Sequence, residues 1–416
     1  MTASMSEEPS EKPLPTGFEL FEIDPVYRAD PYTRLAELRA RAPVHLDPVL
    51  NQYVLTRYED VKGVVNDRTL WRHPKHARAD SMFHRFVDRN EFDRVRPRDG
   101  ESILFMDDPD HARVRTPLTK VFYKRAAKMR AEVEAIVDGV LDGLAGRPSF
   151  DVIADYGIPI PILVIAKVLG VERERLREFR EWSEGIILSL HIARSEAQTR
   201  EMLAADEALT RYFTQAMEDR RQNPKDDLIT DLVQLQAEGA PLSDGEVRIN
   251  ASALLVGGNL TTTDLIGNGV YLFLNHPAEL AKLAADPSLA ANAVEEILRY
   301  ESPVSLTSRV APREMQLGGC PLHAGDPLMT YLRAANRDPA MFEDPDRFDI
   351  TRKHVSHMAF GGGAHICIGA PLARMEAQVA LPRLFARFPN LKLAAQTFEW
   401  RALPGFRGLE RLTVEL

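Results

Sequence analysis

Cysteine is almost absent from this chain: its 416 residues include only two, Cys320 and Cys367. Two cysteines cannot build the disulfide framework of a small secreted protein, and so few thiols suit a reducing cytoplasm. A surplus of basic charge is lacking as well, because 61 acidic and 52 basic residues are mixed along the chain and give a net charge of −9. Nucleic-acid binding normally needs a clustered basic surface, so we expect no nucleic-acid partner.

The chain also lacks a long, purely apolar run. The stretch poorest in charge, 251–274, contains Asn259, Asp264 and three successive threonines, which a lone membrane span would tolerate badly. Residues 1–16 are polar and rich in Glu, Ser and Pro, without the apolar centre of a signal peptide. These features predict a soluble, cytoplasmic protein without membrane association, whose residues 1–16 form a disordered tail.

Helical patterns dominate the rest of the sequence. We expect helices over 31–42 and 58–66, almost throughout 109–238 with breaks near Gly146, Pro159, Gly170 and Pro224, from the capping box of Ser243 and Glu246 to Leu274, and over 277–285, 289–300 and 370–388. A short hairpin is expected from strands at 44–46 and 53–56, with further short strands between 300 and 370, and 72–100 is expected to be a functional or mobile loop. Because the sequence has no internal repeat and no linker, residues 17–416 are predicted to form a single, mainly α domain with small β-sheets.

The most informative segment is Phe360-Gly-Gly-Gly-Ala-His-Ile-Cys-Ile-Gly369. Three consecutive glycines allow the backbone to pass close to a flat, bulky group. Cys367 lies just before a helix that begins near Ala370, where amide N–H groups and the positive end of the helix dipole favour a thiolate. Simpler interpretations are a buried cysteine in a glycine-rich loop, or a weak phosphate cradle, although the Lys-Ser or Lys-Thr of a phosphate loop is absent.

This segment resembles the haem-binding loop of the cytochromes P-450, Phe-Gly-x-Gly-x-His-x-Cys-x-Gly, and every fixed position is filled. The resemblance extends from about Asp24 to the C-terminus. It implies a mainly α fold enclosing haem b, with Cys367 as the iron ligand, and a thiolate ligand favours O–O cleavage. Zinc is a poorer candidate, because His365 and Cys367 offer only two ligands. The loop residues that the resemblance places at the cofactor are Phe360, Gly361, His365, Cys367 and Gly369.

Haem b carries two propionates, which need cationic or hydrogen-bonding partners when they are buried. The resemblance assigns this role to His111 and Arg115, four residues apart on a helix capped by Asp108, and to Arg309 and His365. Each of these residues can instead be an ordinary solvated group.

A helix before the cysteine loop carries Glu296 and Arg299, three residues apart on one face. Taken alone, this is an ordinary surface ion pair. Its position matches the family's Glu-x-x-Arg motif, so we expect the pair to brace the fold behind the cysteine loop.

In the central helix, the residues from Gly257 to the third threonine resemble the family's Ala/Gly-Gly-x-Asp/Glu-Thr-Thr. Glycine costs roughly 1 kcal/mol inside a helix, so Gly257 and Gly258 invite an explanation. Thr261 is the expected catalytic residue: its hydroxyl can donate to the Gly257 carbonyl and open a pocket for oxygen, although the glycines can also serve close packing. Leu260 occupies the acid position and cannot carry a proton, which leaves ordered water, Asn259 or a substrate group as the proton route.

The sequence contains no flavin, nicotinamide or ferredoxin module, so electrons from NAD(P)H are expected to arrive through a separate iron–sulfur ferredoxin and its reductase. Arg113, Lys120, Lys124 and Lys128 lie near one helical face and form a candidate docking surface, with a plain solvated face as the alternative. The substrate pocket is expected to be mostly apolar, although core packing explains the same residues equally well. The pocket residues that we expect are Ile187, Leu254, Val304 and Leu306.

The leading hypothesis is a haem-thiolate monooxygenase that inserts one atom of O2 into an apolar small molecule, by hydroxylation or epoxidation. Leu260 motivates a second hypothesis, a peroxide-driven or non-oxidative haem-thiolate enzyme. A third is a non-catalytic haem-binding sensor, which the Thr261 hydroxyl disfavours. The sequence does not identify the substrate.

Overall fold

The structure is a computed structural model that describes residues 13–17, 19–85, 99–191, 194–353 and 355–416. Its α-helices are α1 (Pro25–Ala29), α2 (Tyr32–Arg41), α3 (Tyr58–Asn66), α6 (Asp110–Ala126), α7 (Arg130–Leu144), α8 (Pro159–Leu169), α9 (Leu176–Ile187), α10 (Glu196–Gln222), α11 (Leu228–Ala237), α12 (Asp244–Asn275), α13 (Pro277–Ala285), α14 (Ala290–Tyr300), α15 (Leu332–Ala335) and α16 (Ala370–Arg387). Its strands are β1 (Val44–Asp47), β2 (Gln52–Leu55), β3 (Ser149–Asp151), β4 (Leu306–Val310), β5 (Met315–Leu317), β6 (Cys320–Leu322), β7 (Pro327–Tyr331), β8 (Lys392–Leu393) and β9 (Thr413–Glu415). The predicted fold class, mainly α with small β-sheets, is confirmed.

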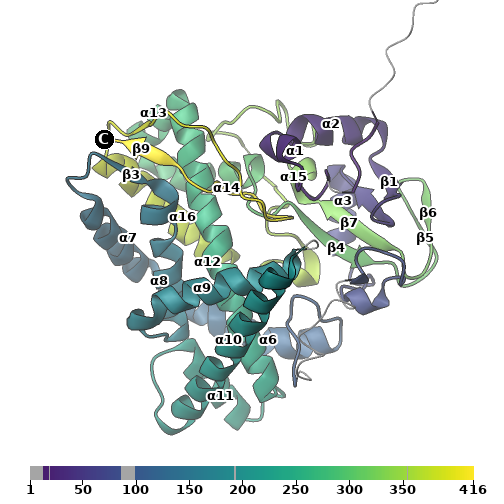
Figure 1. Cartoon of the computed structure of the whole chain (residues 1–416), viewed down its shortest axis with the longest axis horizontal. Helices are drawn as coiled ribbons and strands as arrows, with labels where there is room; N and C mark the ends of the chain where they lie inside the picture. The colour runs from purple at the N-terminus through teal and green to yellow at the C-terminus, as the bar shows by residue number, and fades with distance from the viewer. Residues whose placement is uncertain (1–12, 18, 86–98, 192–193, 354) are drawn as a thin grey trace, which may run out of the picture.

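The long helix α12 crosses the middle of the molecule (Figure 1). Its predicted capping box is present: the Glu246 amide donates to Ser243 Oγ at 3.1 Å, and the Ser243 amide donates to Glu246 Oε2 at 2.9 Å. Buried residues occur on every side of α12, which therefore packs against α8, α9, α10, α14 and α16 at once. A helix in this position contributes a wall to any cavity inside the protein.

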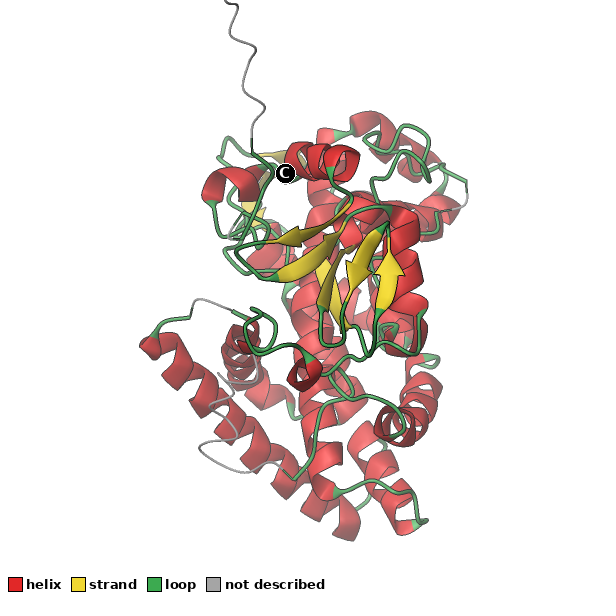
Figure 2. Cartoon of the chain, turned by 90° about the vertical axis from the view of Figure 1, so that its right-hand side faces the viewer, coloured by secondary structure: helices red, strands yellow, loops and turns green. Residues whose placement is uncertain are grey.

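The largest sheet has the strand order β1-β2-β7-β4 and lies to one side of the helices (Figures 1 and 2). The predicted hairpin is confirmed, with β1 antiparallel to β2 and Val44 opposite Leu55. β7 joins it in parallel to β2 and antiparallel to β4, and every residue of β7 is buried. The sheet thus connects the N-terminal part of the chain to the segment that precedes the cysteine loop.

Two features were not indicated by the sequence patterns. Helix α1 precedes the predicted first helix, and Asp24 Oδ1 caps it by accepting from the Val26 amide at 2.8 Å. The region 109–238 is mainly helical with a break near Gly146, as predicted, but that break contains the strand β3, which a π-helical turn, Val152–Gly157, follows before α8. β3 pairs with β9 at the far end of the chain, a contact that local periodicity cannot reveal.

Apolar side chains form one large core among the helices and smaller ones around the sheet. Within the described ranges, one stretch, Val152–Leu169, is long and apolar enough to cross a bilayer by length and composition alone. It is 67% buried inside the protein, as expected for a helix that packs in this core. Most of the predicted tail, residues 1–12, lies outside the described residues, and the single domain over 17–416 stays a prediction.

Candidate active site

The cysteine loop runs from Phe360 to Cys367 and leads directly into α16. The Cys367 amide donates to the Phe360 carbonyl at 2.9 Å and closes the loop. Gly361 and Gly363 have φ of 69° and 61°, a conformation that L side chains rarely adopt. A Cβ on Gly363 would lie 2.5 Å from the Val65 carbonyl oxygen of α3. The glycines therefore fit the loop against α3, in addition to shaping the backbone beside the cavity.

A cavity of about 410 Å³ lies where the helical core meets the large sheet. Cys367 sits deep in the protein, yet its side chain is exposed because it faces this cavity. Helix α12 forms another wall and contributes Leu254, Gly257, Thr261 and Leu265. Further lining residues are Met82, Phe83, Phe105, Leu190, Leu298, Val304, Leu306, Met329 and Phe406. One mainly apolar cavity thus holds both a thiol and a hydroxyl.

The α12 wall has the local geometry that the sequence suggested. Thr261 Oγ1 donates to the Gly257 carbonyl at 2.8 Å. A Cβ on Gly257 would meet nothing within 4 Å, so this glycine leaves space in the cavity. A Cβ on Gly258 would lie 3.1 Å from Ile165 of α8. The two glycines therefore serve different purposes. Gly257 leaves space in the pocket, and Gly258 allows α12 to pack closely against α8.

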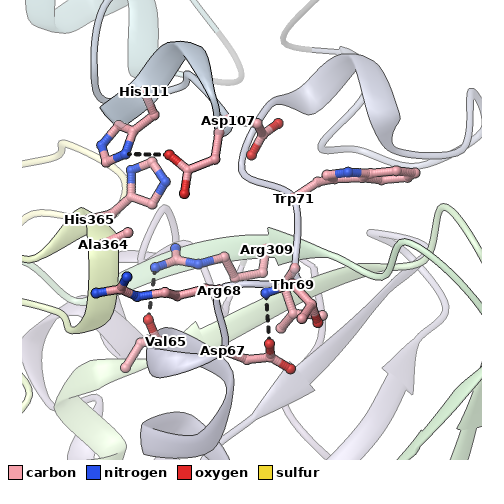
Figure 3. Close-up of a pocket in the computed structure, with 12 residues that line it drawn as sticks. Val65, Asp67, Arg68, Thr69, Trp71, Asp107, His111, Arg309, Ala364 and His365 are labelled. Carbon is pink, nitrogen blue, oxygen red and sulfur yellow. Dashed lines mark hydrogen bonds and ion pairs between the residues drawn. The ribbon is translucent and has the colours of Figure 1, made fainter. Parts of the chain in front are cut away.

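Basic side chains gather beside the loop, around a smaller cavity of about 120 Å³ that adjoins it (Figure 3). The rings of His111 on α6 and His365 in the loop are stacked, with centroids 4.1 Å apart. Arg309 of β4 approaches from the sheet and donates to the Val65 carbonyl at 3.2 Å. Residues from a helix, a loop and a strand, far apart in sequence, thus form one cationic cluster.

Two more arginines extend this cluster to the wall of the larger cavity. Arg72 donates to the Ser308 carbonyl at 3.2 Å, and Arg115 of α6 donates to the Ile366 carbonyl of the loop. Burial lowers the pKa of Arg115, and burial with repulsion from Arg309 lowers the pKa of Arg72 to about 9. Burial therefore disfavours the charged forms of both arginines, and repulsion from Arg309 adds to this effect at Arg72.

Burial and nearby positive charge also lower the pKa values of the two histidines of the cluster, His111 and His365. Burial, followed by repulsion from Arg309 and His111, lowers the pKa of His365 to about 2. The buried atoms His111 Nε2, His365 Nδ1 and Arg72 Nε have no hydrogen-bond partner among the described residues. Unpartnered nitrogens beside surplus positive charge make a site for an anionic group.

Comparison with known proteins identifies the family. The family model described as Cytochrome P450 matches residues 186–400. The chain is 39% identical over 407 residues to cytochrome P450 107B1 of Saccharopolyspora erythraea, covering 95% of this chain and 97% of the relative. The chain belongs to the cytochrome P450 family.

Further relatives agree with this membership. The 6-deoxyerythronolide B hydroxylase of the same organism is 36% identical over 398 residues, covering 94% of this chain and 97% of the relative. The solved structure of the myxobacterial cytochrome P450 CYP267B1 in complex with myristic acid has a TM-score of 0.87 and 34% identity, with 96% of this chain and 98% of that chain covered. As a cytochrome P450, this chain is a haem-containing monooxygenase and therefore an oxidoreductase.

The structure brings most of the predicted P450 site residues together. Those that line the larger cavity are Arg115, Gly257, Thr261, Phe360, Gly361, His365, Cys367, Leu254, Val304 and Leu306. His111 and Arg309 line the smaller cavity with His365. Gly258 packs on α8, and Gly369 is the N-cap residue of α16. Ile187 is not among the described residues that line either cavity.

Arg72 is the member of the cationic cluster that the sequence interpretation missed. It stands in the irregular segment 72–100, where no periodicity or motif marks one arginine above another. Its position depends on the bridge between Trp71 and Val310, which places Arg72 beside Arg309. The crowding of His and Arg in this segment was the one available indication.

The thiol of Cys367 differs from the sequence-based expectation. The amides of Gly369 and Ala370 at the start of α16 lower its pKa, as does Arg115, so the expected stabilising groups are present. Burial is nevertheless the largest influence and raises the pKa of the thiol overall. The helix terminus and Arg115 therefore do not outweigh the effect of burial on the pKa of this thiol.

The Glu-x-x-Arg pair on α14 is fully buried, so its interpretation as an ordinary surface ion pair is wrong. Arg299 donates to both carboxylate oxygens of Glu296, at 2.8 and 2.7 Å, and both side chains are 0% exposed. Arg352 lies 3.2 Å from the same carboxylate. Arg299 also donates to the carbonyls of Asn336, Pro345 and Arg347. This network fixes the turns that precede the cysteine loop.

Proposed function

We propose that this cytochrome P450 inserts one oxygen atom of O2 into an apolar small molecule, by hydroxylation or epoxidation. For a hydroxylation, RH, O2, NAD(P)H and one proton give ROH, water and NAD(P)+. The observation that carries the proposal is that the Cys367 thiol and the Thr261 hydroxyl line one mainly apolar cavity.

The proposed cofactor is haem b, with Cys367 as the ligand of its iron. When bound, a thiolate-ligated haem supplies the redox chemistry that activates dioxygen. The protein fits its two propionates: the cationic cluster has three unpartnered buried nitrogens, and burial, together with repulsion between its basic groups, lowers the pKa values of Arg72 and His365. The proposed propionate partners are His111, Arg115, Arg309, His365 and, in addition, Arg72. Phe360 and Gly361 would border the cofactor from the loop side.

Thr261 is the proposed catalytic residue. Its hydroxyl proton is held by the Gly257 carbonyl, which leaves the hydroxyl oxygen able to accept a hydrogen bond from a proton donor in the cavity. Exchange of hydrogen bonds at this atom would let Thr261 pass a proton toward dioxygen.

The lining of the cavity supports an apolar substrate. Leu254, Val304 and Leu306 present hydrocarbon, and Phe83 and Phe406 add aromatic surface. The relatives named above, a hydroxylase of 6-deoxyerythronolide B and a P450 solved with myristic acid, support the same class of molecule.

We further propose that electrons from NAD(P)H arrive through a ferredoxin and its reductase, in the cytoplasm. Of the four basic residues of the candidate docking surface, we propose that only two contact the ferredoxin. Arg113 is paired with Asp110 and Glu246, and Lys128 lies beyond the end of α6. Lys120 and Lys124 are exposed on α6, the helix whose Arg115 contacts the cysteine loop. These two lysines are therefore the proposed docking residues.

The first test is the absorption spectrum of the reduced, carbon monoxide-bound protein, recorded beside the Cys367→Ala variant. A strongly red-shifted Soret band in the parent that disappears in the variant is the expected result. A histidine-like spectrum in the parent would contradict thiolate ligation and remove the basis of the proposed reaction.

A peroxide-driven reaction is the second candidate, because Leu260 leaves the usual proton-carrying position empty of an acid. Myristic acid, as the apolar probe, is incubated either with peroxide alone or with NAD(P)H, ferredoxin and reductase. Oxidised product from the second mixture, in excess of the first, supports the monooxygenase. Product from peroxide alone would favour the alternative, and none from either mixture would favour a haem-binding sensor.

A further inference from the structure

Asp264 is a buried carboxylate of α12 that has no role in the reaction proposed above. The residue is 1% exposed. Its Oδ1 is paired with Arg401 of the C-terminal segment, whereas its Oδ2 is buried without a hydrogen-bond partner in the part of the chain that the structure describes. An ionised carboxylate with one unsatisfied oxygen is costly to bury, so this position needs an explanation.

Helix geometry places Asp264 one turn after Leu260 and Thr261 on α12. Asp264 follows Leu260 by four positions and Thr261 by three, and each residue of an α-helix advances by about 100°. Asp264 therefore lies on the face of α12 between Leu260 and Thr261, one turn further along. Asp264 is not among the described residues that line the cavity, whereas Thr261 and its own neighbour Leu265 are, so water has to bridge its carboxyl group and the Thr261 hydroxyl.

The charges around Asp264 allow it to hold a proton near neutral pH. Burial raises the pKa of its carboxyl to about 6, although Arg401 from the C-terminal segment and Arg180 from α9 lower it, and Glu410 adds a smaller rise. An acid with a pKa close to the working pH can both hold and release a proton. The Arg401 side chain is 17% exposed and Glu410 is exposed, so the side of Asp264 that faces Arg401 lies close to solvent.

We propose that Asp264 is the proton-relay residue of this enzyme and takes over the task that Leu260 cannot perform. Asp264 releases a proton through water to the Thr261 hydroxyl, which passes its own proton into the cavity, and a solvent proton entering beside Arg401 restores the acid. Each turnover that converts RH and O2 to ROH and water takes up two protons in all, one of them delivered by NAD(P)H. This relay rests on the proposed monooxygenase function, but it concerns the proton route alone.

A purely structural role is the competing interpretation, in which the Asp264–Arg401 pair only braces the C-terminal segment against α12. Gly408 supports close packing there, because a Cβ on it would clash with the carboxyl group. The two interpretations differ for Arg401→Gln. A brace predicts that Asp264→Asn and Arg401→Gln have the same effect, whereas a relay predicts that Arg401→Gln raises the pKa of Asp264 and shifts a pH profile upward.

The first experiment measures the proton on Asp264 itself and does not depend on turnover. Infrared spectra of the parent and Asp264→Asn proteins are recorded from pH 5 to 8 and subtracted. A protonated-carboxyl band that is lost as pH rises through about 6 is expected in the difference. Glu376, whose buried carboxyl has a strongly raised pKa, is present in both proteins and cancels. A difference without such a band at any pH would show a permanently ionised partner of Arg401 and overturn the relay.

The second experiment measures dioxygen consumption driven by NAD(P)H, ferredoxin and reductase, with myristic acid as the apolar probe. Because a positioned acid contributes about 10²–10⁴-fold and water replaces part of it, Asp264→Asn should slow consumption at least about tenfold and abolish its rise toward low pH. Arg401→Gln should keep that rise and move its midpoint to higher pH. Two outcomes would contradict the relay. One is an equal rate of dioxygen consumption in the parent and Asp264→Asn; the other is an equal fall of that rate in Asp264→Asn and Arg401→Gln, with no shift of the midpoint in Arg401→Gln.

Two further variants separate the relay from general damage. Asp227→Asn is the matched control, because Asp227 is also buried and arginine-paired, 2.8 Å from Arg220, but lies at the start of α11. It should leave the pH profile unchanged. Leu260→Glu in the Asp264→Asn background should restore consumption to within about threefold of the parent, since it returns an acid beside Thr261. If the parent itself lacks the thiolate spectrum and consumes no dioxygen, the proposed function fails; if only these variants fail to respond, the relay alone fails.

Discussion

At position 260, a leucine that is 6% exposed stands directly before Thr261, where an acid would sit in the family's pattern. Leucine can neither donate nor accept a proton, so the residue that completes the site must lie elsewhere. The side-chain amide of Asn259, one of the routes considered from the sequence, accepts from Arg180 at 3.4 Å. This hydrogen bond joins α9 to α12, and Asp264, one turn after Leu260, is the proposed proton donor.

Returning an acid to this position gives a prediction at the scale of one residue. In the otherwise unchanged protein, Leu260→Glu or Leu260→Asp should raise the product formed per NAD(P)H consumed, because each places a second proton donor beside Thr261. We expect a gain of about twofold, far below the 10²-fold or more of a sole acid, since Asp264 already delivers protons. The measurement compares product with NAD(P)H loss, using myristic acid as the probe.

The matched control is Leu260→Gln, which has the size and polarity of glutamate without a proton to transfer. It should give no gain. Unchanged coupling in both acidic variants would count against the view that a proton donor is missing at this position.

Among the elements, α14, α16 and the cysteine loop are joined by one carboxylate. Glu295 of α14 accepts two hydrogen bonds from Arg374 of α16, at 2.7 and 2.9 Å, and lies 3.2 Å from His357 Nε2. The Arg374 guanidinium lies 4.5 Å from the centre of the Phe360 ring. The tie therefore holds the start of the loop and the helix that follows it in one position relative to α14.

This tie predicts a pH-dependent stability. Burial raises the pKa of Glu295, but His357 and Arg374 outweigh it and hold the pKa at about 2, below the usual 4.5. A depressed pKa stabilises the folded protein above pH 4.5, and this contribution is lost as pH falls from 4.5 toward 2. Glu295→Gln should therefore lower the free energy of unfolding at pH 7 by about 2 kcal/mol, after a discount because the side chain is 25% exposed.

Urea denaturation at several pH values measures this difference. The gap between the parent and Glu295→Gln should narrow as pH falls below 4.5. Glu178→Gln, which removes an exposed, arginine-paired glutamate on α9, is the control and should leave the denaturation curve unchanged. A gap that stays constant down to the acid limit would show that Glu295 contributes through packing and not through its charge.

The same elements show how far a sequence can predict structure. The start of α12 was predictable because Ser243 and Glu246 form a local pattern whose two hydrogen bonds lie within four residues. The cysteine loop was predictable because its motif is contiguous. Arg72 was not, since its position follows from the bridge of Trp71 to a residue of β4, and neither was β3, whose partner is β9. The raised pKa of the Cys367 thiol was missed for the same reason, because the burial that outweighs the helix terminus depends on the whole fold.

At the scale of the whole molecule, a net charge of −9 coexists with exposed lysines on α6, the helix whose Arg115 contacts the cysteine loop. Lys120 and Lys124 lie on α6, and Tyr123 between them is 39% exposed. Ile366, whose carbonyl accepts from Arg115 of the same helix, is 46% exposed. Exposed apolar side chains on α6 and on the loop that Arg115 contacts, together with two lysines of α6, suit an acidic electron donor.

Reversal of these charges gives the prediction that tests the surface. The double variant Lys120→Glu, Lys124→Glu should slow the reduction of the P450 by an acidic ferredoxin about tenfold at low ionic strength, because steering depends on opposite charges. The difference should close in about 1 M salt, where the screening length falls to roughly 3 Å. Stopped-flow reduction at several salt concentrations measures both effects. Lys392→Glu, a change of an exposed lysine on β8, is the control and should leave the rate unchanged. A double variant with the parent's rate and salt dependence would place the ferredoxin on another face, and the exposed Ile366 would then need a different partner.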